Sequence, residues 1–428
     1  LDLITDINHS KKQNNIVELV LLPVFVVGAF FIVMQSTLNP WSVHMPHLDS
    51  AVWISRAVAM KQGQMIYVDV WDHKGPLLFI LQYLGLSITP HSLVGIWLLE
   101  WASMTVTLFF LFRVARLFTE SKWVALFALL LSVLPLQYYF QKGNCVEAWA
   151  LPFISASLLI FMKYLKNHQL IFYQVILAGA CMTCAFLLNG NLISVWVAFI
   201  PVIVFILLVE RNWRQLGLCI AGFIAGIIIV AGPVLLWLWI KGALSAFIEA
   251  YFFFNSSYTG GVTLGSFYSS IMKFAYMDSY FLWIHIASFI CILFGRRSGL
   301  WETLRPEWTL FLYSFVSLCM LSMSGRGYLH YGIQLIPCMV IPAVVLVDRL
   351  YHWCGSNGKL WLIMIILFLC WFRFDGEHFL DNIMWTMDET AVNYDACGEY
   401  EDYVTINNWT GRWSDAELET KVVEYMGD

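Results

Sequence analysis

Charge is what this sequence has least of. Only 12% of its 428 residues are charged, whereas 60% are hydrophobic and 17% are aromatic. Soluble domains carry about 25% charged residues. This shortage excludes an ordinary soluble protein and predicts an integral membrane protein. The net charge is only −5 and no basic stripe is present, so we expect no nucleic-acid partner.

Three chemical patterns are also missing. The ten cysteines are scattered, mostly within apolar runs, which argues against a disulfide framework. No phosphate-binding loop for a soluble nucleotide sugar is found. The histidines and acid at 44–49 do not follow a recognised zinc spacing, and the HExxH pattern is absent. We therefore expect no required cofactor; a divalent metal at His47 and Asp49 is the alternative.

Long apolar runs are abundant instead, and a helix needs about 20 apolar residues to cross a bilayer. The predicted fold is an all-α polytopic membrane protein with about eleven transmembrane helices. The shorter run 76–87 begins with Pro76 and predicts an interfacial helix. The predicted spans are 16–38, 93–112, 123–140, 146–162, 170–188, 192–209, 215–240, 279–295, 307–324, 331–348 and 359–374.

Basic residues set the predicted orientation. With the N-terminus inside, the short inner loops hold 14 of the 24 Lys and Arg residues, as the positive-inside rule requires. No cleavage site follows the first span, so we expect it to be retained. The loops 39–92 and 241–278 then face outward. Residues 1–374 form the predicted transmembrane domain, and residues 375–428 a small outer region.

Polar chemistry is concentrated just after the first span, on the predicted outer side. Three acids, three histidines and Lys74 lie within 31 positions; the acids and histidines are Asp49, Asp69, Asp72, His44, His47 and His73. Ionisable residues at the membrane are costly, and a cluster of them indicates a functional site.

Each part of this cluster has a plain structural alternative. Asp49 begins an amphipathic segment ending at Gly63, so it is either a helix N-cap or a general base. Asp72 and Lys74 form either a solvated turn with an internal ion pair or a phosphate ligand oriented by an acid. Glu147 either contacts substrate or starts a solvated helix. The aromatic segment 241–278 is either a lid or an interfacial belt.

The residues Asp49, Gly63 and the stretch Y-x-D-x-x-D-x-K-x-P-L at 67–77 resemble the first outer loop of the GT-C superfamily of membrane glycosyltransferases. The resemblance is to the bacterial branch related to protein O-mannosyltransferases and aminoarabinose transferases. Three later segments agree with it, and together they extend the resemblance over residues 16–374. They are GNCVEAWALP (143–152), LAGACMTCAFLLNGN (177–191) and GRGYLHYGIQLIP (325–337).

The resemblance implies transfer of a sugar from a polyprenyl phosphate on the outer face. Asp49 would deprotonate the acceptor hydroxyl. The donor phosphate would be bound by Lys74, Arg326, His330 and Tyr331, with Asp69, Asp72 and His73 in support. Acceptor or donor contacts are expected from Glu147, Asn144, Asn189, Asn255 and Tyr258. Two positions depart from the pattern: Ser50 replaces a second acid, and Asn189 stands where relatives often have Lys.

The predicted partners are a polyprenyl-phosphate-linked sugar, the lipid bilayer and an acceptor that is a glycopolymer, a lipid or a protein. The expected location is a bacterial plasma membrane, with the active site outside. A transporter or flippase of lipid-linked sugars is the main alternative. It should place polar residues in both halves of the membrane, whereas here they gather on one side. A non-catalytic assembly subunit would not need Asp49, Lys74 and Arg326.

Overall fold

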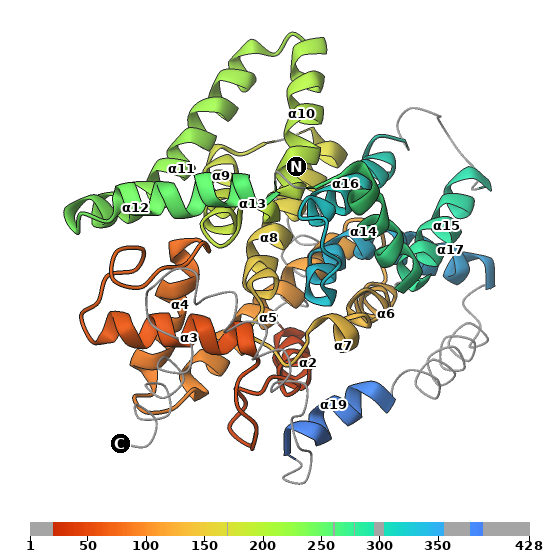
Figure 1. Ribbon diagram of the computed structural model, residues 1–428. Helices are drawn as coiled ribbons and strands as arrows, with labels where there is room; N and C mark the ends of the chain where they lie inside the picture. Colours follow the sequence, from red (N-terminus) through yellow and green to blue (C-terminus); the bar gives the residue numbers. More distant parts are fainter. Residues whose placement is uncertain are drawn as a thin grey trace.

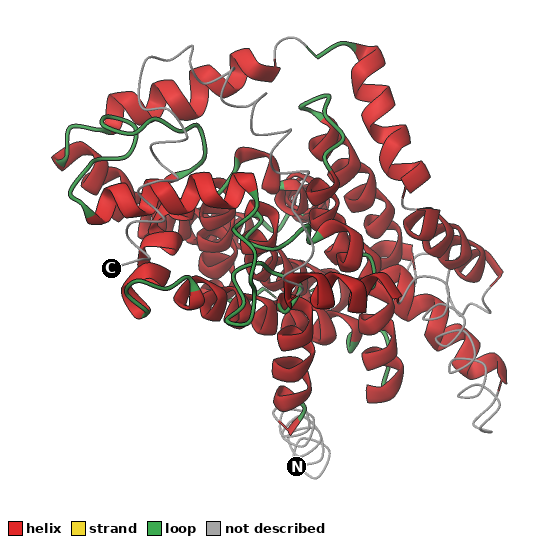
Figure 2. Cartoon of the chain, turned by 60° about the horizontal axis from the view of Figure 1, so that its bottom comes forward, coloured by secondary structure: helices red, strands yellow, loops and turns green. Residues whose placement is uncertain are grey.

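The computed structural model describes residues 20–168, 170–259, 262–277, 279–294, 304–354 and 377–387. Figures 1 and 2 show a helical architecture, and within these ranges the only β-type pairing is a bridge between Ile66 and Val70. This confirms the all-α prediction. The helices are α2 (Leu22–Val33), α3 (Leu48–Lys61), α4 (Pro76–Ile88), α5 (Val94–Ala115), α6 (Lys122–Val133), α7 (Leu136–Tyr139), α8 (Val146–Asn167), α9 (Phe172–Phe186), η1 (Gly190–Leu192), α10 (Ser194–Val209), α11 (Trp213–Ile240), α12 (Leu244–Ile248), η2 (Glu249–Phe254), α13 (Asn255–Thr259), α14 (Leu264–Met277), α15 (Ser279–Phe294), α16 (Leu304–Ser322), η3 (Leu329–Leu335), α17 (Ile336–Cys354) and α19 (Glu377–Met387).

The apolar helices follow the predicted spans. Five helical stretches among the described residues are long and apolar enough to cross a membrane. Shorter apolar helices occupy the predicted spans at 16–38, 170–188, 192–209, 279–295 and 307–324. The predicted span 359–374 lies outside the described residues. The protein is therefore a polytopic membrane protein.

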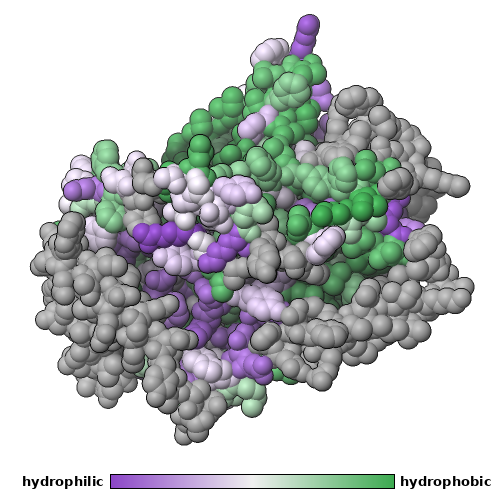
Figure 3. All heavy atoms as spheres, turned by 45° about the vertical axis from the view of Figure 1, so that its right-hand side comes forward, coloured by the Kyte–Doolittle hydropathy of each residue, from purple (hydrophilic) through white to green (hydrophobic). Residues whose placement is uncertain are grey.

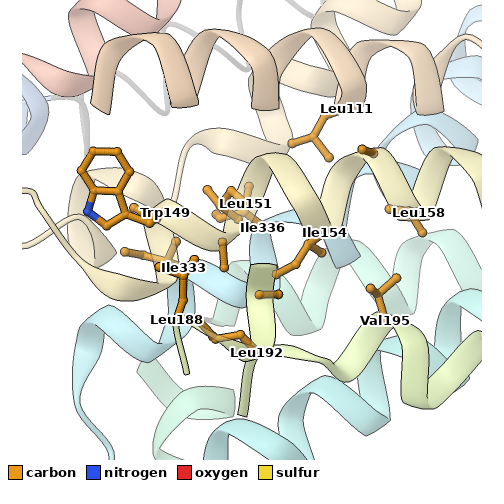
Figure 4. Close-up of a cluster of buried hydrophobic side chains, with 14 of the residues drawn as sticks. Leu111, Trp149, Leu151, Ile154, Leu158, Leu188, Leu192, Val195, Ile333 and Ile336 are labelled. Atoms are coloured by element: carbon orange, nitrogen blue, oxygen red, sulfur yellow. The ribbon is translucent and has the colours of Figure 1, made fainter. Parts of the chain in front are cut away.

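Helix α8 is the centre of the packed core. Its buried side chains meet α5 on one side and the turn after α9 on another, as Figure 4 shows. The 3-10 helix η3 and the start of α17 close the cluster. The labelled residues are Leu111, Trp149, Leu151, Ile154, Leu158, Leu188, Leu192, Val195, Ile333 and Ile336. The first residues of α8 are thus fixed by surrounding helices, and they lead directly into the polar region described below.

Two glycines bring α9 and α11 into close contact. A Cβ on Gly179 would lie 2.3 Å from the carbonyl oxygen of Phe223, and one on Gly226 would lie 2.0 Å from that of Ile176. In a membrane no hydrophobic effect drives helices together, and small residues at the interface allow the helix backbones to pack closely. This contact fixes the middle of α9, the helix that leads into the turn at 187–191.

The predicted outer segments are largely helical. Helix α3 ends at Lys61 and is followed by Gly63 at φ +89°, where the sequence predicts its end. Within 241–278, the segments α12, η2 and α13 run together between α3/α4 and the α10/α11 pair in Figure 1, and α14 follows them. The lid reading of this segment stays a prediction.

Helix α19 is the described part of the C-terminal region, and it packs on the first outer loop. Asn382 donates to Gln35 Oε1 and to the Gln137 carbonyl, at 3.1 and 2.8 Å. The Trp385 ring is stacked on His44 with centroids 4.0 Å apart, and the Lys142 ammonium lies 4.3 Å from its centroid. The rest of 375–428 lies outside the described residues.

Candidate active site

Asp49 lies in the first turn of α3, with its side chain half-buried. The N-cap of this helix is His47, so the N-cap interpretation of Asp49 is wrong. Among the described residues, the Asp49 carboxylate forms no hydrogen bond or ion pair. A carboxylate held by its helix but not bound by other protein groups is available to accept a proton.

Asp72 is a buried junction of the first outer loop, only 5% exposed. Its Oδ1 accepts a hydrogen bond from the backbone N–H of Lys74 at 2.9 Å. Its Oδ2 lies 3.7 Å from Nε of Arg56, which projects from α3. His73 Nδ1 lies 3.9 Å from Oδ1. Asp72 therefore fixes the backbone of Lys74, whereas its charge is shared with an arginine that the sequence analysis did not single out.

The segment after Asp72 is bound to the end of α9. The backbone N–H groups of Gly75 and Leu77 donate to the carbonyls of Leu188 and Leu187, both at 3.1 Å. A Cβ on Gly75 would lie 1.9 Å from the Leu187 oxygen, so only glycine fits here. The Tyr67 hydroxyl donates to the Lys74 carbonyl at 2.7 Å. The Lys74 backbone is thus held on both sides, while its ammonium forms no hydrogen bond or ion pair among the described residues.

The pKa of His73 is affected by four charged side chains. The pKa of His73 is lowered to about 4, mainly by burial and then by the Lys74 charge; Asp72 and Asp49 act in the opposite direction, and Arg326 lowers it. His73 is therefore a neutral imidazole at neutral pH. Since all four charges act on one ring, the structure brings Asp49, Asp72, Lys74 and Arg326 together, although they come from segments far apart in sequence.

The π-helix η2 lies against this ring. Asn255, directly after η2, donates through Nδ2 to the carbonyls of His73 at 2.9 Å and Tyr251 at 2.8 Å. Phe254 packs edge-on against Trp71, with ring centroids 4.8 Å apart. Short π-helical segments occur often at functional sites. Asn255 thus contacts the first outer loop, and the side chain of Tyr258 lies outside the described residues.

The 325–337 motif supplies Arg326 and a stack of aromatic rings. Arg326 Nη1 donates to the Tyr328 hydroxyl at 3.2 Å. The rings of Tyr328 and His330 are parallel, with centroids 5.7 Å apart, and Tyr331 meets His330 edge-on at 4.8 Å. Gln141 Oε1 accepts from the His330 backbone N–H at 3.2 Å and lies 3.0 Å from its Nδ1. This motif is therefore tied to the turn at 141–144.

Asn144 in that turn is fully buried, and its side-chain amide forms all the hydrogen bonds that it can. Its Nδ2 donates to Ser50 Oγ at 2.7 Å and to Gln82 Oε1 at 3.1 Å. Its Oδ1 accepts from Gln82 Nε2 at 2.8 Å and from Trp149 Nε1 at 2.9 Å. An amide has two donors and two acceptor lone pairs, so none is left for a substrate. Asn144 binds Ser50, the neighbour of Asp49, and this position favours a supporting role over the predicted contact.

The remaining predicted residues lie in different surroundings. Asp69 is exposed, and its Oδ2 accepts from the Met65 N–H at 2.6 Å, which closes a turn. Asn189 Oδ1 accepts from the Asn191 N–H at 3.4 Å and caps η1. Glu147 is only 2% exposed, so it does not start a solvated helix, and its Oε2 has no hydrogen-bond partner in the part of the chain that the structure describes. A substrate contact by Glu147 stays a prediction.

Polar and apolar residues occupy different parts of the surface. In Figure 3, apolar surface covers the projecting helices at the top, and hydrophilic surface gathers lower on the same face. An apolar cavity of about 200 Å³ lies between α8, α9, α10 and α11, lined by residues such as Phe161, Ala178, Ile203 and Phe223. None of the polar residues described above lines it. In the described part of the chain, no three His, Cys, Asp or Glu side chains are grouped as metal ligands.

Comparison with known proteins bears on the family and the fold. Residues 73–237 match the model of the dolichyl-phosphate-mannose-protein mannosyltransferase family. The fold is similar to the crystal structure of ArnT from Cupriavidus metallidurans bound to undecaprenyl phosphate, with 18% identity and a TM-score of 0.54. The apo state of ArnT gives a TM-score of 0.52 at the same identity.

Both ArnT alignments cover 81% of this chain and 63% of ArnT, so the chain spans less than two thirds of that protein. No curated protein matches the sequence. The resemblance to GT-C membrane glycosyltransferases is confirmed, and the fold is ArnT-like.

Proposed function

We propose that this membrane protein is an inverting glycosyltransferase that moves a sugar from a polyprenyl phosphate to an acceptor hydroxyl on the outer face of the membrane. The observation that carries the proposal is the convergence of Asp49, Lys74 and Arg326 on His73. One ionisable acid and two cations are the groups that this transfer needs. The mannosyltransferase family model and the lipid phosphate in ArnT support the class of donor.

The proposed chemistry assigns the proton to Asp49. As the acceptor oxygen forms a bond to the anomeric carbon, the bond from that carbon to the phosphate oxygen breaks. The acceptor proton passes to the Asp49 carboxylate, which is not bound by other described groups. Attack from the side opposite the phosphate inverts the anomeric carbon. General-base catalysis of this kind contributes about 10²- to 10⁴-fold to a rate.

The leaving phosphate gains negative charge during this step. Lys74 and Arg326 are proposed to stabilise that charge, because preorganised cations in a water-poor site act where charge develops. The backbone of Lys74 is fixed by Asp72, Tyr67 and the end of α9, which leaves only the side chain to adjust. His330 and Tyr331 are proposed to line the same phosphate pocket. A phosphate is already a good leaving group, so no separate strong acid is required.

The proposed location is a bacterial plasma membrane, with the active site on its outer side. A glycopolymer, a lipid or a protein hydroxyl would suit a base that opens to the outer side.

The proposed mechanism uses no cofactor. Addition of a chelator should leave turnover unchanged if this is right, whereas loss of turnover that Mn²⁺ or Mg²⁺ restores would show a metal requirement.

Transfer and transport are separated by the fate of the donor. In proteoliposomes loaded with polyprenyl-phosphate sugars and supplied with an acceptor hydroxyl, a transferase moves the sugar to the acceptor and releases free polyprenyl phosphate, whereas a flippase moves the intact lipid between leaflets. We expect polyprenyl phosphate to appear with the wild type and not with Asp49→Asn. Movement of intact donor without cleavage, unaffected by Asp49→Asn, would replace the transferase proposal with transport.

A further inference from the structure

Arg56 has no place in the chemistry proposed above, yet it lies at the centre of the site. Its side chain is only 12% exposed, and its Nε lies 3.7 Å from Oδ2 of Asp72. That distance makes an ion pair but not a hydrogen bond, and Nε has no hydrogen-bond partner within the described ranges. Nη1 reaches the Ser55 hydroxyl at 3.4 Å. A buried guanidinium paired with a buried carboxylate calls for an explanation, because such pairs are expensive to desolvate.

The position of Arg56 links the two halves of the proposed chemistry. Arg56 follows Asp49 by seven residues in α3, which is about two helical turns and places both on one face. Asp72 in turn lies two residues before Lys74 and binds its backbone N–H. The Arg56–Asp72 pair therefore fastens the helix that carries the base to the turn that carries the phosphate ligand.

Without a second partner, the buried carboxylate of Asp72 would compete with a phosphate for the ammonium of Lys74. A carboxylate that is 5% exposed and two residues from a lysine attracts the lysine ammonium strongly, because the surroundings screen charge poorly. An ammonium captured by Asp72 could not bind a phosphate. In the structure Oδ2 faces Arg56 and Oδ1 faces the Lys74 backbone. Both oxygens of Asp72 are thereby engaged, and the Lys74 ammonium stays unbound among the described groups.

The formal charges agree with this division. Among the charged side chains that act on His73, together with Arg56, three cations exceed two carboxylates by one unit. A glycosyl phosphodiester carries one negative charge and balances it. When the phosphate leaves as a monoester its charge rises toward two, while Asp49 becomes neutral by taking the acceptor proton. The site then has two positive units, so the charges stay matched through the reaction. Without Arg56 they would not match.

We infer that Arg56 is a positioning residue of the donor-phosphate site: by neutralising Asp72, it keeps the ammonium of Lys74 available for the phosphate. The inference rests on the proposed function for its role in turnover. Its structural content, that Arg56 prevents Asp72 from capturing Lys74, is independent of any substrate.

The kinetic test uses Arg56→Gln, Arg56→Lys and the double variant Arg56→Gln/Asp72→Asn. In Arg56→Gln the freed Asp72 captures Lys74, and we expect KM for the donor to rise tenfold or more with kcat within about threefold. Arg56→Lys should keep most of the affinity. The double variant has no buried anion to capture Lys74, so KM should return to within about threefold of wild type. An unchanged KM in Arg56→Gln, or a double variant as weak as the single one, overturns the inference.

A second measurement needs no turnover. An amine-acylating ester is reacted with the folded protein, and modification of Lys74 is followed by mass spectrometry. We expect labelling to slow at least fivefold in Arg56→Gln and to recover in the double variant. Equal labelling in all three proteins contradicts the inference. A wild type that labels as expected but binds no donor would instead remove the proposed function and leave the ion-pair assignment intact.

The matched control is Lys61→Gln, which removes a cation from the same helix. The Lys61 ammonium lies 5.5 Å from the ring centroid of Tyr83, apart from Asp72. We expect wild-type KM and Lys74 labelling in this variant. If Arg56→Gln does not fold, the double variant decides alone: wild-type KM and labelling support the inference, and a folded double variant that stays defective overturns it.

Discussion

The turn at 141–144 and the first outer loop meet at the same site, but they use their polar side chains differently. In the turn, Gln141 is occupied by His330 and Asn144 by three other side chains. In the first outer loop, the charged ends of Asp49 and Lys74 have no hydrogen-bond partner among the described residues. The difference separates groups that hold the site from groups that are free to meet a substrate.

Backbone geometry follows the same division. Residues 141–144 all have positive φ, from 40° at Gln141 to 84° at Gly143. Non-glycine residues in this region cost about 1–3 kcal/mol each and persist only where the surroundings determine them. The hydrogen bonds of Asn144 and Gln141 provide those surroundings. The turn is a fixed frame, against which the α3 and 72–76 segments are positioned.

The largest effect is expected where a free group does chemistry. Asp49→Asn keeps the shape of the side chain but cannot take a proton, so turnover should fall by about 10²- to 10⁴-fold. Thermal unfolding in detergent should stay within a few degrees of wild type, because the carboxylate supports no described hydrogen bond. Full activity in Asp49→Asn, measured as polyprenyl phosphate released, would move the base elsewhere, with Glu147 as the first candidate.

The next largest effect is expected on stability, when the turn at 141–144 loses the hydrogen bonds of Asn144. Asn144→Ala leaves Gln82, Ser50 and Trp149 without a buried partner, and each unsatisfied group costs about 1–3 kcal/mol. We expect a large drop in the unfolding temperature together with loss of donor binding. Asn189→Ala is the control, since a short helix cap is worth about 1 kcal/mol. Equal unfolding temperatures for the two variants would show that Asn144 does not stabilise the turn at 141–144.

Lys74→Ala tests the second free group. A hydrogen bond to a charged group contributes about 1.5–3 kcal/mol, so donor affinity should fall by roughly 10- to 150-fold. The fold should persist, because the backbone contacts of Lys74 remain. Lys142→Ala removes a nearby cation that lies over Trp385 instead, and should leave donor affinity unchanged. Equal losses in both variants would mean that the phosphate responds to overall charge rather than to Lys74.

His73 predicts a pH dependence of stability. Burial, with Lys74 second, lowers its pKa to about 4 in the folded protein, below the usual value near 6.5. The unfolded chain therefore binds more protons between these values. Stability should be full above pH 6.5 and fall as the pH drops toward 4, by at most about 1.4 kcal/mol per unit. His73→Gln should flatten this slope in thermal unfolding at pH 7, 6 and 5; an identical slope would show that His73 is not its source.

The smallest effect concerns α19. Trp385→Ala removes the stack on His44 and the cation–π contact with Lys142, which is worth about 0.5–1 kcal/mol at exposed sites. Amide hydrogen exchange in 377–387 should accelerate several-fold, while that in α8 should not change. Unaltered exchange in 377–387 would show that Asn382 and Thr386 hold the helix without the tryptophan.

Local patterns predicted the fold well because each depends on neighbouring residues. Apolar runs located the spans, and Gly63 marked the end of α3. The Arg56–Asp72 pair and the bonds of Asn144 to Gln82 and Ser50 escaped prediction, because they join residues 16, 62 and 94 positions apart. One signal for Arg56 was available: its spacing of seven from Asp49 places both on one helix face. Nothing comparable distinguishes a saturated Asn144 from one that contacts substrate.

Donor binding separates the proposed role of Asp49 from that of Lys74. Purified wild type, Asp49→Asn and Lys74→Ala are titrated with a polyprenyl-phosphate sugar in nanodiscs. We expect tight binding by the wild type, nearly equal binding by Asp49→Asn, and binding weakened at least tenfold in Lys74→Ala. Loss of binding in Asp49→Asn with full binding in Lys74→Ala would contradict the assigned roles, and no binding by the wild type would contradict the proposed function itself.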